Sequence, residues 1–138
     1  MARNAARPLS PHLTIWKWGP HMLVSILHRA TGVALAIGGG IVFTWWLAAA
    51  AAGGEAYRRF VDLLTVRSGN LNIIGLVLFV GLTWSFFQHM STGIRHLILD
   101  TGAGYELKSN KTGALATMAA SVTLTVIVWG FILSRGLV

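Results

Sequence analysis

The sequence has no cysteine and few charged residues. Without cysteine, the chain itself cannot form a disulfide, hold an iron–sulfur cluster through thiolates or use a thiol nucleophile. Charged residues make up 11% of its 138 residues, against about 25% in soluble domains, whereas hydrophobic residues make up 54%. The length fits one domain. The low charge and high apolar content exclude an ordinary soluble enzyme.

The excess of cations does not indicate a nucleic-acid partner. Lys and Arg outnumber Asp and Glu by 11 to 4, which gives a formal net charge of +7. Nucleic-acid-binding proteins cluster their cations on a soluble face. Here the cations lie between long apolar segments. We therefore expect the lipid bilayer, and no nucleic acid, as the surroundings of most of the chain.

Three apolar blocks predict an all-α integral membrane protein with three transmembrane helices. Each block exceeds the ~20 residues that a helix needs to cross the hydrocarbon core, and none alternates as a barrel strand does. A cleaved signal peptide is the alternative for the first block, but that block is too long for the ~7–15-residue apolar core of such a peptide. The predicted order begins with an N-terminal arm, residues 1–20, and a first span, residues 21–52. A connection over residues 53–70 leads to the second span, residues 71–100, and a connection over residues 101–112 leads to the third span, residues 113–134.

The flanking segments predict an extended N-terminal arm and an orientation. Pro8, Pro11 and Pro20 prevent a continuous helix in the arm. Cytoplasmic loops are enriched in Lys and Arg. The side with the N-terminus carries seven cations and the other side four: Arg3, Arg7, Lys17, Arg29, Arg95, Lys108 and Lys111 against Arg58, Arg59, Arg67 and Arg135. We therefore predict a cytoplasmic N-terminus, a cytoplasmic 101–112 connection and a periplasmic 53–70 connection. The 53–70 connection is short and polar, with a helical turn expected around residues 55–64.

Two groups of polar residues lie inside the spans, where ionisable side chains are costly and are candidates for function. Ser25, His28 and Arg29 stand near the start of the first span, and His89 and His96 toward the end of the second. Arg95 and Asp100 accompany the second group. Antiparallel spans place the start of one beside the end of the next, so we expect the two groups to meet.

The second group is compatible with a haem. Neutral imidazole ligates iron, Gly93 would admit the flat macrocycle, and cations nearer the water would hold its propionates. Only His89 is a deep histidine, so a second axial ligand would come from another chain. The alternative is an interhelical hydrogen bond from His89 and a packing notch at Gly93, and the spacing does not decide between them.

The first group also allows two interpretations. Ser25 and Arg29 are four residues apart on one helix face, where a hydroxyl and a guanidinium could hydrogen-bond a quinone carbonyl. Alternatively, Arg29 binds lipid phosphate and extends toward the membrane surface. Gly32, Ala36 and Gly40 form a stripe of small residues that we interpret as a packing face without chemistry.

Three segments carry a family resemblance: RPLSPHLTIWKW, SILHRATG and HMSTGIRHLILDTG. Together they resemble the cytochrome b membrane-anchor subunit, the C subunit, of succinate dehydrogenase, respiratory complex II. The resemblance spans residues 7–102, and the third apolar block agrees in character alone. Trp16 stands where the family often has tyrosine.

The resemblance implies roles for particular residues. It makes His89 an axial ligand of haem b, with the other ligand from the companion D anchor subunit. It assigns the haem propionates or pocket to His28, Arg29, Gly93 and His96. It assigns the ubiquinone site to Ser25 and Arg29, with the neighbouring Ile26.

The implied function is that of a subunit that is not catalytic alone. FAD and the iron–sulfur clusters would lie on a flavoprotein and an iron–sulfur subunit, and this chain would anchor them in a bacterial inner membrane. A self-contained b-type cytochrome or a transporter fragment is the alternative. Those proteins would show paired deep histidines, or repeats and interrupted helices, and neither pattern is visible in the sequence.

Overall fold

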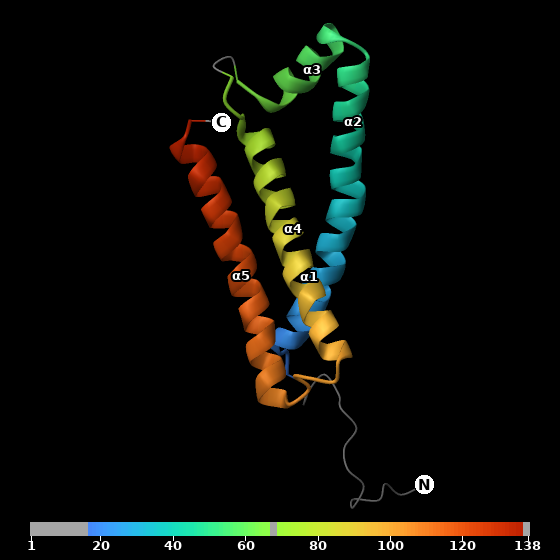
Figure 1. The fold of residues 1–138 in the computed structure, drawn as a ribbon. Helices are drawn as coiled ribbons and strands as arrows, with labels where there is room; N and C mark the ends of the chain where they lie inside the picture. The colour runs from blue at the N-terminus through green and yellow to red at the C-terminus, as the bar shows by residue number, and fades with distance from the viewer. Residues whose placement is uncertain (1–16, 67–68, 137–138) are drawn as a thin grey trace, which may run out of the picture.

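The first apolar block forms a long helix that is interrupted in its middle by a wider turn (Figure 1). The computed structural model describes residues 17–66 and 69–136. Within them, helix α1 spans Pro20–Val33, the π-helical turn η1 spans Ala34–Gly39 and helix α2 spans Gly40–Ala51. Pro20 suits the first position of α1, because a helix leaves that amide unbonded and proline has none to donate.

Three further helices follow. Helix α3 spans Gly54–Leu64, helix α4 spans Ile73–Asp100 and helix α5 spans Leu107–Ser134. Helix α3 lies across one end of the bundle, whereas the α4–α5 connection lies at the opposite end (Figure 1). The chain therefore runs along the length of the bundle three times.

The prediction of an all-α protein with three membrane spans is confirmed. Three helical segments are long and apolar enough to cross a membrane: Pro20–Ala51, Ile73–Asp100 and Leu107–Ser134. Their orientation stays a prediction. Most of the predicted arm, residues 1–16, lies outside the described residues.

The interruption of the first span was not predicted. The amide of Gly40 reaches the carbonyl of Leu35, five residues back, instead of the usual four. Glycines follow one another at positions 38–40, where the backbone resists such widening least. A Cβ on Gly39 would lie 3.8 Å from Cδ2 of Leu82, so this turn lies beside α4.

Both predicted connections contain helix, and the helical turn expected around residues 55–64 is confirmed as a helix of its own. Gly53 adopts a φ of +100°, where a side chain would be strained, and reverses the chain before α3. Most of the predicted 53–70 connection is therefore the helix α3. Helix α5 begins at Leu107, inside the predicted 101–112 connection. Its first turns are polar, so an apolar run did not mark them as part of the helix.

Helices α4 and α5 pack through small and polar side chains. Gln88 is fully buried, accepts a hydrogen bond from Ser121 Oγ at 2.6 Å and donates one to Thr92 Oγ1 at 3.0 Å. Most large apolar side chains are exposed on the outside of the bundle. This inversion is typical of membrane bundles, where small residues allow close approach and lipid solvates the apolar surface.

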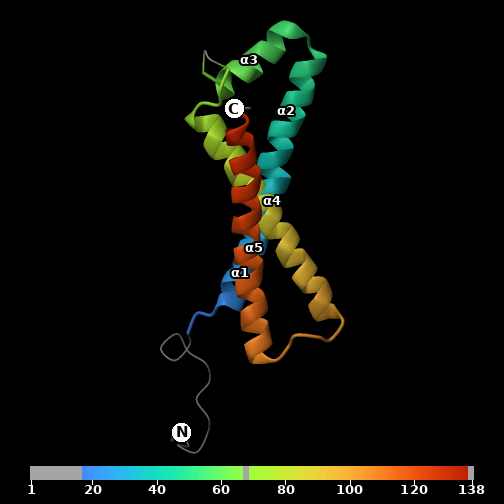
Figure 2. The same cartoon turned by 60° about the vertical axis from the view of Figure 1, so that its left-hand side comes forward.

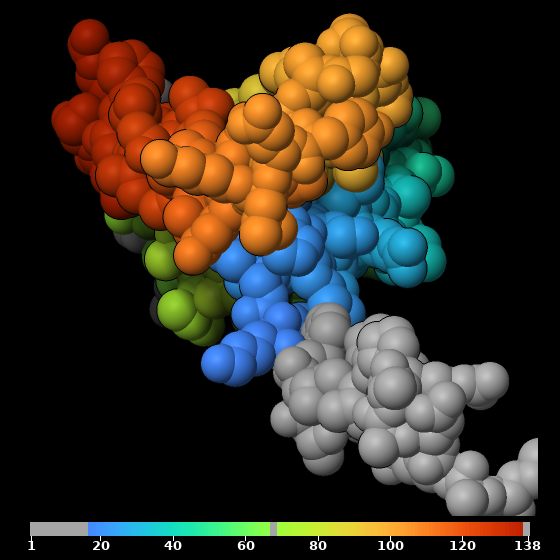
Figure 3. Space-filling view, turned by 90° about the horizontal axis from the view of Figure 1, so that it is seen from below, coloured from blue at the N-terminus to red at the C-terminus, as the bar shows by residue number. Residues whose placement is uncertain are grey.

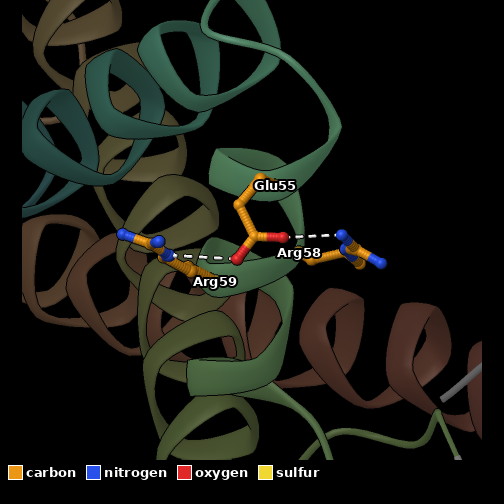
Figure 4. A network of polar contacts seen from close by, with 3 residues as sticks. All are labelled: Glu55, Arg58 and Arg59. Atoms are coloured by element: carbon orange, nitrogen blue, oxygen red, sulfur yellow. Dashed lines mark hydrogen bonds and ion pairs between the residues drawn. The ribbon is translucent and has the colours of Figure 1, made fainter.

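The end covered by α3 has a small apolar cluster and exposed ion pairs. Ala49, Phe60 and Leu64 are buried together between α2, α3 and α4. On the outer face of α3, the Glu55 carboxylate lies 2.6 Å from Nη2 of Arg58 and 3.4 Å from Nε of Arg59 (Figure 4). Helix α3 is thus amphipathic, with its apolar side toward the spans.

Candidate functional site

Three histidines gather where α1 meets α4. The His28 ring of α1 stacks on the His89 ring of α4, with centroids 4.0 Å apart and planes 6° from parallel. The His96 ring approaches the His28 ring edge-on, with centroids 5.1 Å apart. We refer to these three residues as the histidine cluster. The expectation that the two polar groups meet is confirmed for them.

The backbone of α1 fixes the tautomer of His89. Nδ1 of His89 lies 3.1 Å from the carbonyl oxygen of His28. Because a carbonyl oxygen only accepts hydrogen bonds, Nδ1 must carry the hydrogen. Thr31 Oγ1 lies 3.5 Å from the same nitrogen and donates to the carbonyls of Leu27, at 2.7 Å, and of His28, at 3.1 Å. In the neutral ring, Nε2 therefore keeps its lone pair, as a metal ligand must.

A glycine on α1 makes room for the His89 ring. A Cβ added to Gly32 would lie 3.0 Å from Cε1 and 3.3 Å from Nδ1 of His89, which is tighter than ordinary packing. A Cβ added to Gly93 would meet nothing within 4 Å. The role of Gly93 beside a haem stays a prediction, whereas Gly32 contributes directly to the position of His89.

The residues expected to bind quinone lie outside the histidine cluster. Ser25, Ile26 and Arg29 all have exposed side chains on the first turns of α1. None of them makes a side-chain hydrogen bond or ion pair within the described ranges. Their polar groups are therefore available to a ligand or to another chain, and their roles stay predictions.

Arg95 points away from the histidine cluster and toward α5. Its Nη2 donates to Oδ1 of Asn110 at 2.5 Å. A Cβ on Gly113 would lie 3.6 Å from its Nε, so the guanidinium lies against the first turns of α5. His96 and Asp100 are i, i+4 neighbours but form no ion pair. All ion pairs of the described residues lie in α3. The polar residues at the end of the second span thus serve two different faces.

Sequence reasoning missed Thr31 and the contact of Gly32 with His89. Thr31 is a buried hydroxyl in an apolar run, with 2% of its surface exposed. It lies less than one helical turn after His28, which is a signal that could have added it to the site. Gly32 was assigned to a packing stripe, and its contact depends on the register between α1 and α4, which one sequence does not reveal.

The fold and site together define a class: a three-span membrane protein with an imidazole near one end of its bundle that is oriented by a backbone carbonyl. The family model for the succinate dehydrogenase/fumarate reductase transmembrane subunit matches residues 3–128. The chain is 32% identical over 123 residues to the succinate dehydrogenase cytochrome b556 subunit of Rickettsia felis, covering 89% of this chain and 90% of that protein.

Two further relatives agree. Over 121 residues the chain is 36% identical to the succinate dehydrogenase cytochrome b556 subunit of Paracoccus denitrificans, covering 88% of each. Over 119 residues it is 35% identical to the mitochondrial succinate dehydrogenase cytochrome b560 subunit of Mus musculus, covering 86% of this chain and 68% of that protein. The chain belongs to the family of succinate dehydrogenase/fumarate reductase transmembrane subunits. It is therefore a membrane component of an oxidoreductase complex, not an enzyme by itself, as the sequence predicted.

Proposed function

We propose that this chain is the cytochrome b membrane anchor of a succinate:ubiquinone oxidoreductase in a bacterial inner membrane, with its N-terminus in the cytoplasm. It would assemble with a flavoprotein, an iron–sulfur subunit and a companion anchor subunit. The observation that carries the proposal is the Nδ1 hydrogen bond of His89 to the His28 carbonyl. In a family whose relatives are named cytochrome b subunits, this contact prepares His89 Nε2 as a haem ligand.

The residues present fit a haem b bound through His89. Gly93 has open space beside it, and Nδ1 of His28 is buried without a hydrogen-bond partner in the described residues. A buried nitrogen without a partner is costly and would gain from a propionate acceptor. Arg29 and the exposed His96 would supply further cationic or donor groups near the membrane surface. When bound, the haem would supply a one-electron redox centre.

The stacking of His28 on His89 supports a shared haem over a self-contained cytochrome. His89 would hold the haem iron through Nε2, and His28, whose ring lies directly against the His89 ring, would not be a second ligand of the same iron. The His28 and His89 rings are 4.0 Å apart and nearly parallel. His28 would therefore not supply the second ligand. A companion anchor subunit would provide it.

Ser25, Ile26 and Arg29 would form this chain's part of the ubiquinone site. Their side chains are exposed on neighbouring positions of α1 and make no hydrogen bond within the described residues. The Ser25 hydroxyl and the Arg29 guanidinium would donate to a quinone carbonyl oxygen, and the guanidinium would stabilise negative charge developing there during reduction. Succinate, FAD and the iron–sulfur clusters would be held by the partner subunits.

The haem assignment is tested by spectra of the purified complex. His89→Leu removes one axial ligand, so we expect the low-spin b-type signal in a reduced-minus-oxidised spectrum to be lost or strongly shifted. His96→Leu is the matched control and should alter the signal less, because His96 is exposed and makes an edge contact. An unchanged spectrum in the His89 variant would transfer the ligand role to another residue.

The quinone assignment is tested by comparing two acceptors. Arg29→Leu removes a charge-assisted hydrogen bond, which corresponds to about tenfold or more in quinone turnover, and Ser25→Ala should lower turnover by less. Succinate oxidation with an artificial dye should stay near the unsubstituted level, since the flavin would lie on another subunit. Equal loss of both activities would indicate failed assembly, and full quinone activity in both variants would contradict the assignment.

A further inference from the structure

Arg95 is a cation of a membrane span without an anionic partner in the described part of the chain. Its side chain is partly buried, and Asn110 Oδ1 accepts one of its hydrogen bonds. A guanidinium has five N–H donors, so most of them have no acceptor in these ranges. Asp100 and Glu106, the acidic residues nearest in sequence, are exposed and form no ion pair with it.

The guanidinium borders a cavity between α4 and α5. The two helices diverge toward the end where they are connected, as Figure 2 shows, and Figure 3 gives the view of this end from below. The cavity measures about 380 Å³, within the roughly 300–1,000 Å³ of ligand pockets. Its walls are mostly apolar and include Ile94, Ile98, Ala116 and Ala120. Hydroxyl groups of Ser91 and Ser109 line the same cavity as Arg95.

This combination of features is specific about its ligand. An inorganic anion would satisfy Arg95 but would leave the apolar walls without a partner. A neutral apolar molecule would fill the cavity but would leave the guanidinium unpaired, which is unfavourable inside a membrane. An amphiphile with an anionic head and a hydrocarbon chain satisfies both, because phosphate oxygens accept the fork of a guanidinium and the chain replaces lipid along the helices.

We propose that the α4–α5 cavity binds one anionic phospholipid, with its phosphate on Arg95 and an acyl chain along the apolar walls. Asn110 holds the guanidinium in position through its 2.5 Å hydrogen bond. The site is distinct from the histidine cluster, since His89 contacts α1 whereas Arg95 contacts α5. The proposal does not depend on the haem or quinone assignments.

The test uses the chain purified together with its co-purifying subunits in a neutral detergent. After lipid removal, the complex is titrated with phosphatidylglycerol or phosphatidylcholine, and bound lipid is counted by native mass spectrometry. We expect one site that prefers phosphatidylglycerol. Arg95→Gln should weaken it about tenfold, the usual effect of losing a charge-assisted hydrogen bond, whereas Arg95→Lys should retain part of the affinity.

Two further variants separate this effect from general ones. Arg135→Gln removes the same charge from an exposed position at the other end of α5 and should leave binding unchanged. Ala116→Leu keeps Arg95 but narrows the cavity, so it should also weaken binding. Circular dichroism of each variant complex serves to check that helix content is retained. If Arg95→Gln does not fold, Ala116→Leu and Arg95→Lys decide the outcome.

Several results would overturn the proposal. Equal retention of phosphatidylcholine would show a site without charge selectivity, and displacement of the lipid by inorganic phosphate alone would show a simple anion site. If the unsubstituted complex bound no added phosphatidylglycerol, another subunit would cover the cavity. Unchanged binding in both Arg95→Gln and Ala116→Leu would place the lipid elsewhere.

Discussion

The two ends of the bundle differ in what holds them together. At the end covered by α3, Phe60 and Leu64 are buried in an apolar cluster, and the Glu55 carboxylate pairs with two arginines of the same helix. At the opposite end, His89 donates to a backbone carbonyl and Arg95 to an amide oxygen, whereas Nδ1 of His28 and most N–H groups of Arg95 have no partner in the described residues. The first end therefore pairs these charges within one chain, although Nε1 of Trp129, near the end of α5, is buried without a hydrogen-bond partner in the described residues. The second has the unsatisfied groups that a ligand or a partner subunit would satisfy.

The largest effect expected from a single change that tests this contrast is at Gly32. Gly32→Leu would displace the His89 ring and separate Nδ1 from the His28 carbonyl, so most of the low-spin b-type signal of the purified complex should disappear. Gly32→Ala should give a smaller shift of the same signal. Gly81→Ala is the control, because a Cβ there meets nothing within 4 Å. A normal spectrum in Gly32→Leu would show that the α1 contact does not orient His89.

A moderate effect on stability is expected at Asn72, which joins α3 to α4. Its Oδ1 accepts from the Gly75 amide at 2.9 Å, and its Nδ2 donates to the Leu63 carbonyl at 2.7 Å. Asn72→Ala removes this N-cap and should cost about 1 kcal/mol, measured by denaturant titration of the purified complex. Asn70→Ala, at an exposed neighbour, should change stability little. The haem spectrum should be unaffected in both, and a spectral change would show that the two ends are coupled.

The smallest effect is expected at Glu55. Both of its ion pairs are exposed, with 65% of the Glu55 side chain accessible, so water screens them. Glu55→Gln should change stability by less than about 0.5 kcal/mol in the same titration. A loss as large as that of Asn72→Ala would mean that the ion pairs, and not the apolar cluster, hold α3 in place.

The sequence allowed the three spans to be predicted because the length of an apolar run is a local property. It also predicted that His28 and His89 would meet, since antiparallel topology alone requires it. The helical turn around residues 55–64 could also be predicted, but its packing against the spans could not. Phe60 and Leu64 make this short segment amphipathic without making it apolar, and the sequence does not show which helices cover its apolar side.

The finer parts of the site depend on helix register, which is a tertiary property. Whether Gly32 lies beside the His89 ring is decided by how far α1 slides along α4. Arg95 and His96 are adjacent in sequence but serve different helices, because successive residues of a helix point about 100° apart. One sequence carries no signal for either choice.

The wide turn at Ala34–Gly39 has a consequence for how the two ends of the first span evolve. A turn closed over five residues accommodates one residue more than an α-helical turn, so it offsets the angular phase of everything beyond it by about 100°. Deleting one residue there would restore a regular helix, yet it would rotate Ala49 away from α3 if His28 kept its place. The turn thus sets the rotation of α2 relative to α1. An insertion or deletion in it would be tolerated only if the contacts of α1 or of α2 also changed.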